Sequence, residues 1–233
     1  MKARTLSKIL KLAAICLMLP ANIYAETEED DNVWYGFFGK TKLSESVSWW
    51  TETQLRFNLD ESEMAQALIR TGALFPMADS ETKQEFGLLY AYIQGGLSDS
   101  LQDRPVGAGK EHRIAFQHSM YFLGLFENFS HRIRYEYRKL EAGSELSDRF
   151  RYLGRYNGPA LSENLSLVVW DEIFLNTETN DNDEIDNLDR NRFFVGLRNG
   201  HAEYDFEFGY LNQWAPRDPL GKMDHVFVMY LFL

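Results

Sequence analysis

The feature of this sequence that most limits its fold is an alternation of apolar and polar side chains with a period of two, which recurs along almost the whole chain. In residues 131–138, Ile133, Tyr135 and Tyr137 alternate with arginine and glutamate, and residues 203–213 alternate aromatic with acidic side chains. Successive side chains of a β-strand point to opposite faces of the sheet. The pattern therefore predicts strands with one apolar and one polar face, whereas an amphipathic helix would show a period near 3.6.

The alternating blocks are about as long as a strand that crosses a membrane, which needs roughly 9–11 residues. The segments between them are turn-rich or acidic and alternate between longer and shorter ones, as in barrels of the bacterial outer membrane. The blocks are residues 46–58, 64–76, 84–94, 111–121, 131–138, 149–156, 163–176, 190–198, 203–213 and 224–233.

Residues 33–43 are also strand-like and would bring the count to eleven. A closed barrel in which every pair of neighbours is antiparallel has an even number of strands, as single-chain bacterial barrels do. We therefore predict an all-β fold, a closed antiparallel transmembrane β-barrel of ten strands that omits residues 33–43, with twelve strands as the alternative. Both chain ends would then face the periplasm. Closure is expected because an unpaired backbone group in hydrocarbon costs several kcal/mol.

The first 25 residues have the pattern of a cleaved secretory signal peptide, with a basic start, an apolar stretch from Leu12 to Leu19 and a small residue, Ala25, at the expected cleavage site. The apolar stretch is shorter than the roughly 20 residues that cross a bilayer as a helix. The barrel domain is expected to comprise residues 26–233. Cys16 is the only cysteine, so cleavage would leave no disulfide and no cysteine-based metal site.

An exported barrel of this kind is expected in the outer membrane of a Gram-negative envelope. Its expected partners are outer-membrane lipid and lipopolysaccharide, and the barrel-assembly machinery during insertion. Removal of the leader would take away four basic residues and leave 20 Lys and Arg against 35 Asp and Glu. That balance argues against nucleic-acid binding, which needs a basic surface. The sequence does not predict the oligomeric state.

Sixteen charged side chains are predicted to share the polar face of these strands and to line the lumen. One interpretation is a network of arginine–carboxylate pairs that braces the wall, because buried charges are normally paired. The other is a narrow, porin-like, anion-preferring pore or a cavity for an acidic molecule, because the planar guanidinium suits carboxylate and phosphate. The residues are Glu52, Arg56, Arg70, Arg113, Arg132, Arg134, Glu136, Arg138, Arg149, Arg151, Arg155, Glu172, Arg190, Arg192, Asp205 and Glu207.

A second function class is a barrel enzyme, a lipid or peptide hydrolase with a site at the outer rim. His112 and His225 fall near the predicted outer ends of strands, and a carboxylate within about 3 Å could orient either as a general base. The sequence contains no nucleophile elbow, no histidine pair with metal-ligand spacing and no phosphate loop. We therefore predict no catalytic residue, metal or cofactor. A third class, a soluble periplasmic lipocalin-like binder, would need the apolar faces turned inward.

Two further features have ordinary explanations. Trp49, Trp50, Trp170 and Trp214 are expected to belong to the aromatic girdles at the membrane interfaces. The acidic segment 177–189 lacks the glycine that an EF-type calcium loop needs at its sharp turn, so it is expected to be a solvated surface loop.

Six short runs occur in a characteristic order and spacing along the mature chain. They are TQLRFN (53–58), EHRIAFQ (111–117), HRIRYEYR (131–138), WDEIFLN (170–176), DRNRFFVGL (189–197) and FGYLNQ (208–213). Together these runs resemble the domain of unknown function 2490, a family of bacterial outer-membrane barrel-like proteins. The resemblance covers nearly all of the mature chain, and it implies a fold and a location but no activity or catalytic residue.

Overall fold

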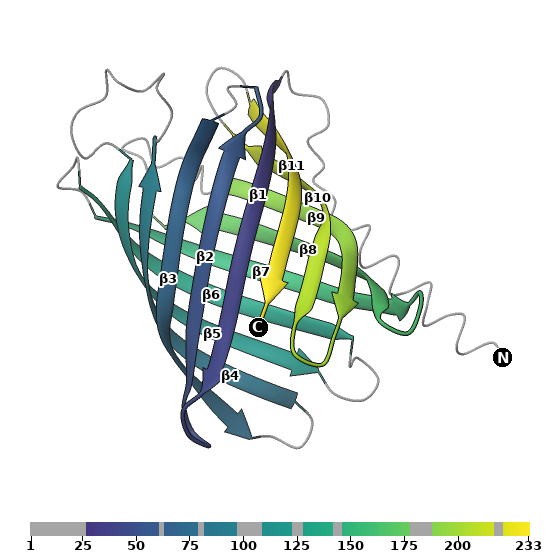
Figure 1. Cartoon of the computed structure of the whole chain (residues 1–233). Helices are drawn as coiled ribbons and strands as arrows, with labels where there is room; N and C mark the ends of the chain where they lie inside the picture. The colour runs from purple at the N-terminus through teal and green to yellow at the C-terminus, as the bar shows by residue number, and fades with distance from the viewer. Residues whose placement is uncertain are drawn as a thin grey trace.

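A computed structural model describes most of the chain after the predicted leader, and its described residues form one closed all-β barrel (Figure 1). No helix among these residues is long and apolar enough to cross a bilayer. The signal peptide predicted for residues 1–25 and most of the acidic segment 177–189 lie outside the described residues. The described ranges are 27–60, 63–78, 82–96, 109–122, 128–141, 146–177, 188–216 and 221–233.

Eleven strands follow one another around the barrel, each next to its neighbour in the chain. They are β1 (Thr27–Lys42), β2 (Ser48–Asn58), β3 (Glu63–Ala78), β4 (Thr82–Gly95), β5 (Lys110–Phe122), β6 (Phe129–Leu140), β7 (Leu146–Ala160), β8 (Leu165–Asn176), β9 (Leu188–Gly200), β10 (Asp205–Ala215) and β11 (Gly221–Phe232).

The barrel closes where its first and last strands run parallel. Thr27 of β1 is opposite Gly221 of β11, and the pairing continues in the same direction as far as Phe38 and Phe232. All other neighbours are antiparallel. The predicted count of ten or twelve strands is therefore wrong, because one parallel seam removes the requirement for an even number. The strand-like segment left out of the ten-strand count belongs to the wall, in which β1 ends at Lys42.

An odd number of strands places the two ends of the described chain at opposite ends of the barrel. The C-terminus lies at the end with the short turns, and β1 begins at the other end (Figure 1). The strand ends that are joined through the longest stretches of sequence, those of β4 and β5 and those of β8 and β9, lie at the end where β1 begins. The expectation that both termini share one side is therefore wrong. Asn199 and Gly200 end β9, and residues 201–204 connect β9 to β10.

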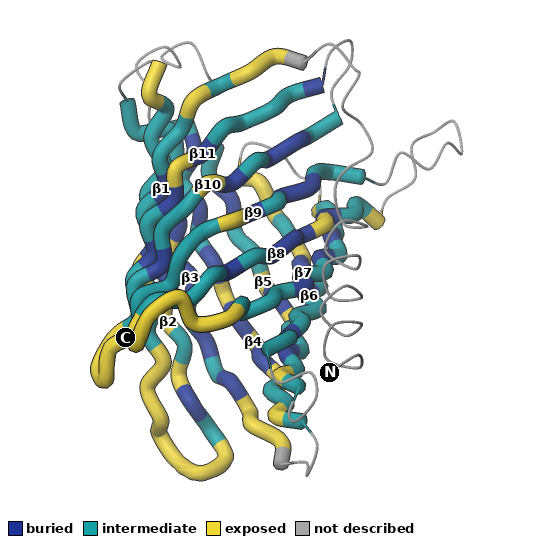
Figure 2. The backbone as a smooth tube through the Cα atoms, turned by 90° about the vertical axis from the view of Figure 1, so that its right-hand side faces the viewer, coloured by how far each residue is buried: buried dark blue, intermediate teal, exposed yellow. Residues whose placement is uncertain are grey.

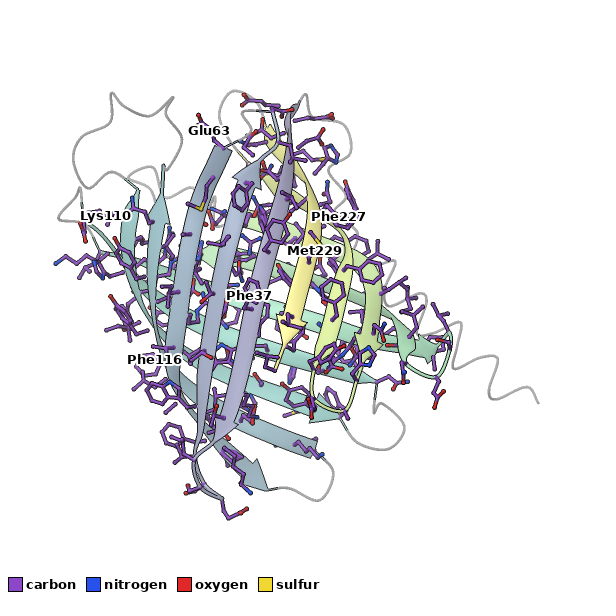
Figure 3. The ribbon with its side chains drawn as sticks, viewed as in Figure 1. Phe37, Glu63, Lys110, Phe116, Phe227 and Met229 are labelled. Carbon is purple, nitrogen blue, oxygen red and sulfur yellow. The ribbon has the colours of Figure 1, made fainter. Side chains whose placement is uncertain are left out.

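The two faces of the wall differ sharply in chemistry. Phe37, Phe116 and Phe227 project outward from three different strands (Figure 3), and they are 49%, 53% and 48% exposed. Charged residues such as Arg134 and Glu136 face inward and are buried. Buried and more exposed residues therefore alternate along the strands (Figure 2). The prediction of an all-β closed barrel with a two-faced wall is confirmed.

The interior is itself divided into an apolar wall and a charged wall. Inward-facing residues of β1 and β8–β11 form one hydrophobic cluster, whose buried members include Trp34, Phe194, Val226 and Tyr230. This explains why the last strand is apolar on both faces. Gly36 is needed in this wall, because a Cβ there would lie 2.6 Å from the Tyr230 ring. The charged side chains come mainly from β2–β7 and face this cluster across the interior.

Candidate functional site

The charged interior surrounds a cavity of about 300 Å³. Of the sixteen side chains predicted to share the polar face, fourteen line this cavity. Glu136 is buried between them, with no exposed surface. Asp205 lies at the short-turn end of β10, where it pairs with Arg198. Closure of the barrel thus brings charged side chains from eight strands to one interior space.

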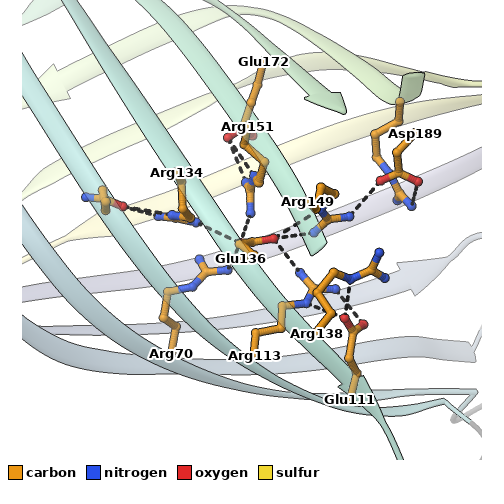
Figure 4. Close-up of polar contacts among 12 residues, drawn as sticks. Arg70, Glu111, Arg113, Arg134, Glu136, Arg138, Arg149, Arg151, Glu172 and Asp189 are labelled. Atoms are coloured by element: carbon orange, nitrogen blue, oxygen red, sulfur yellow. Dashed lines mark hydrogen bonds and ion pairs between the residues drawn. The ribbon is translucent and has the colours of Figure 1, made fainter. Parts of the chain in front are cut away.

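Glu136 is the centre of this interior (Figure 4). Its two carboxylate oxygens accept hydrogen bonds from Arg149 at 2.6 Å and from Arg151 at 2.7 Å. A carboxylate removed from water is stable only when its charge and its lone pairs are compensated. Further positive charge surrounds it, since three more guanidinium nitrogens lie 3.7 Å away, on Arg70, Arg113 and Arg134.

Several ion pairs join strands that are not neighbours. Arg70 of β3 is hydrogen-bonded to Glu52 of β2 at 2.7 Å and also approaches Glu136 of β6. Arg155 of β7 reaches Glu207 of β10 at 2.5 Å. Because two strands separate the members of each of these longer pairs, the contacts span the interior rather than following the wall. They fix separate parts of the wall relative to each other.

A buried aromatic ring lies close to several of the interior arginines. Four guanidinium groups lie 4.4–5.9 Å from the centroid of the buried Phe174 ring, those of Arg149, Arg151, Arg190 and Arg192. The quadrupole of an aromatic ring attracts a cation over its face, and the attraction grows when water is excluded. The Phe174 ring therefore also stabilises these buried charges.

Positive charge exceeds negative charge in the cavity. Eleven arginines but only four glutamates line it, and Glu136 adds one buried acid. The whole chain, in contrast, carries a formal net charge of −11. A low-dielectric wall focuses the field of the charges it encloses. The interior thus favours anions although the molecule as a whole is acidic.

Three residues of this site were not predicted from the sequence, each for a different reason. Glu111 accepts hydrogen bonds from Arg113 and Arg138, and its position two residues before Arg113 on the same strand was a usable signal. Asp189 reaches Arg149 from the start of β9, where a register shift lets it depart from the alternation. Trp34 lies in the segment that the ten-strand count left out.

The tryptophans do not all belong to interfacial girdles. Trp49 faces outward and is exposed. Trp50 and Trp170 instead line the interior cavity, so the girdle interpretation is wrong for these two. The Trp170 indole N–H donates to Glu207 at 3.4 Å. Aromatic identity alone did not show on which face of the strand each ring lies.

The two rim histidines each lie beside a tyrosine and a glutamate on the outer surface. The Nδ1 atom of His112 is 2.7 Å from the Tyr90 hydroxyl, and its Nε2 atom is 3.0 Å from Glu141. This contact with His112 lowers the pKa of the Glu141 carboxyl. His225 lies 2.6 Å from the Tyr210 hydroxyl, but its Nε2 atom is 3.7 Å from Glu29. Neither histidine lines the interior cavity.

The described ranges contain no group of three or more histidine, cysteine or acidic side chains placed to hold a metal ion. The acids of the interior are instead directed at guanidinium groups, as the Glu52–Arg70 and Arg155–Glu207 pairs show.

The family described as "Protein of unknown function (DUF2490)" matches residues 31–223, which is most of the barrel. The chain belongs to the DUF2490 family. The match extends from near the start of β1 to the beginning of β11, so it includes every interior residue discussed above except Val226 and Tyr230. An uncharacterised protein of Methylorubrum extorquens AM1 is 28% identical over 236 residues, which is 96% of each chain. The DUF2490 match and this relative therefore concern the barrel as a whole.

Proposed function

We propose that this DUF2490 protein is an outer-membrane β-barrel with an arginine-braced interior and a narrow, anion-preferring cavity. The observation that carries the proposal is the opposition of the two faces of the wall, with aromatic side chains outside and arginines inside. A soluble lipocalin-like binder would need the reverse arrangement.

The outer surface supports insertion into a bilayer. Large exposed apolar side chains occur on strands all around the barrel, including Ile69, Phe75, Leu88, Ile114 and Phe227. Soluble monomers rarely expose contiguous apolar patches larger than a few hundred Å². A closed wall also pairs its backbone groups, which hydrocarbon requires. Export through the expected signal peptide, insertion by the assembly machinery and contact with lipopolysaccharide belong to this proposal.

The interior supports bracing and a preference for anions over cations. The ion pairs around Glu136 join distant strands, and the excess of arginine would exclude cations from the cavity. A ring of arginine or lysine is how pores for anions and phosphate are commonly built. The aromatic side chains Phe38, Trp50 and Phe232 also line the cavity and would narrow any passage.

The proposal is tested with pure protein refolded into detergent and then into liposomes. A folded membrane barrel should migrate differently on a gel before and after boiling, and it should resist extraction from liposomes by carbonate. In planar bilayers under a potassium chloride gradient, any current should reverse at a potential that shows chloride preference. A protein that stays soluble without detergent, or a current selective for potassium, would overturn the proposal. Complete absence of current would remove the pore and leave the braced barrel.

A second candidate function is hydrolysis at the rim, and the geometry of His112 favours it. The distances to Tyr90 and Glu141 place a hydroxyl and a carboxylate on opposite sides of the imidazole, an arrangement that a general base requires. If this function is correct, His112→Asn should abolish hydrolysis of phospholipid or peptide substrates by the refolded protein. His225→Asn is the matched control, because its carboxylate lies further away.

A further inference from the structure

We propose that Arg56 of β2 and Arg192 of β9, which both line the interior cavity, form a binding site for one small oxyanion, a carboxylate or a phosphate, beside Trp34. The inference deepens the proposed function, because it rests on the positive interior, but it does not depend on insertion into a membrane.

Arg56 is a lumen arginine without a carboxylate partner. Its two terminal nitrogens donate to the side-chain oxygens of Gln54 and Gln66, each at 2.9 Å. No described acidic side chain lies within 4.0 Å of it, and its buried Nε atom has no hydrogen-bond partner among the described residues. The guanidinium carbon lies 3.9 Å from the centroid of the Trp34 ring. A cation held only by neutral groups in an enclosed space leaves its charge available to an anion.

Arg192 is the second undercompensated arginine, and it faces the same ring. Its Nε atom donates to Gln213 at 2.8 Å, and the one described carboxylate within 4.0 Å, that of Glu172, lies at that limit. Glu172 is already engaged by Arg132 and Arg151, at 2.8 Å each. The negative charge of Glu172 is therefore shared among three arginines.

The two groups are close enough to hold one ligand. The guanidinium carbon of Arg192 is 5.0 Å from the Trp34 ring centroid, so the distance between the two carbons cannot exceed the sum of their distances from the ring. Both side chains line the cavity, whose volume admits a small organic acid or a phosphate monoester but not a macromolecule. Arginine forks bind such oxyanions through paired, charge-assisted hydrogen bonds.

Most of the remaining arginines of the cavity do not compete for this role; Arg134, which donates to Gln117 and lies 3.7 Å from Glu136, is the exception, and no contact of it with Trp34 is seen in the described part of the chain. Arg70, Arg149, Arg151 and Arg155 each have a carboxylate oxygen within 2.8 Å. An anion that displaced one of these carboxylates would leave it buried and unpaired, which is strongly unfavourable. Arg56 and Arg192 can accept a ligand without that cost.

The test is isothermal titration calorimetry of the detergent-solubilised, folded full-length protein with inorganic phosphate and, separately, acetate. Sodium chloride at matched ionic strength serves as the background. The wild type should bind one phosphate per barrel with saturable heat, Arg56→Gln should weaken binding at least tenfold, and Arg56→Lys should weaken it less. Arg198→Gln is the matched control, because it removes the same charge outside the cavity lining, and its affinity should stay within twofold of the wild type.

The two sources of the oxyanion are distinguished by comparing the titrants. Tighter binding of phosphate indicates a phosphorylated ligand, and tighter binding of acetate indicates a carboxylic acid. The inference is overturned if the folded wild type binds neither, if chloride abolishes the heat at equal ionic strength, or if folded Arg56→Gln and Arg56→Lys bind as the wild type does. Heat-modifiable migration of the same samples reports separately on the membrane barrel, so the two failures are distinguishable.

Discussion

Glu136 and Arg151 lie on neighbouring strands and are joined by a 2.7 Å hydrogen bond, and Arg151 donates in turn to Glu172 on β8 at 2.8 Å. One guanidinium thus connects two buried carboxylates, and one of these carboxylates is shared with four other arginines. The charges of β2, β3, β5, β6, β7 and β8 therefore form one network rather than separate pairs.

Replacement of Glu136 by glutamine should destabilise the barrel strongly. The change keeps the shape but removes the charge that five arginines surround, and the loss of one partner of a buried pair costs about 3–5 kcal/mol of unfolding free energy. We expect the temperature at which the compact gel band converts to the unfolded band to fall clearly. Glu141→Gln, the same change at an exposed pair, should leave that temperature nearly unchanged. Equal temperatures for the two variants would contradict the network.

Removal of both partners of the Glu52–Arg70 pair should be tolerated better than removal of one. The two side chains are both about 4% exposed and hydrogen-bonded at 2.7 Å. Arg70→Met leaves Glu52 charged in a buried place, whereas the double variant Glu52→Leu/Arg70→Met leaves no unpaired charge there. Denaturant unfolding of both variants and the wild type checks this. A double variant less stable than Arg70→Met would refute it.

The parallel seam should be detectable by cross-linking. Tyr35 and Met229 are in register across β1 and β11, and adjacent strands lie about 4.8 Å apart, a separation that suits a disulfide. The mature chain has no other cysteine if the leader is removed. Tyr35→Cys/Met229→Cys should form a cross-link on mild oxidation, seen as a gel shift that a reductant reverses. Val33→Cys/Leu231→Cys, four residues out of register, should not. A ten-stranded barrel without β1 would cross-link neither.

The odd strand number also predicts the exposure of the chain in cells. Glu28 and Asp60 lie at the end of the barrel with the longer connections, and Ser46 lies at the opposite end. With the longer connections outside, Glu28→Cys and Asp60→Cys should react with a membrane-impermeant maleimide on intact cells. Ser46→Cys should react only after the outer membrane is permeabilised. Protection of residue 28 together with labelling of residue 60 would contradict the parallel seam.

The alternation of residues along a strand was sufficient to predict the strands themselves and which side chains share a face. In residues 131–138, for example, the period of two places Arg134 and Glu136 on the same face of the strand, independently of the rest of the fold. The closure could not be predicted in the same way. The first residues of β1, Thr27–Asn32, are mostly acidic and do not alternate, so their pairing depends on β11, nearly 200 residues away.

Partners across the lumen were likewise beyond the reach of the sequence. Arg155 and Glu207 were both expected on the polar face, but only the curvature of the closed wall brings β7 and β10 within reach of each other. Asp189 shows a local limit, since a register shift between Phe174 and Leu175 alters the alternation of the facing strand. A shift of this kind turns a side chain toward the other face of the sheet, and the residue types along the strand do not show it.

The most direct test of the account is the environment of the outward-facing aromatic positions. Nitroxide labels on Phe116→Cys and Phe227→Cys, which lie on different sides of the barrel, can be measured by electron paramagnetic resonance in liposomes with dissolved oxygen and with a water-soluble nickel chelate. Oxygen partitions into the hydrocarbon and the chelate does not. If the aromatic face contacts lipid, both labels should be relaxed by oxygen and protected from the chelate. Strong relaxation of both labels by the chelate would show that this face meets water, and it would contradict the membrane barrel.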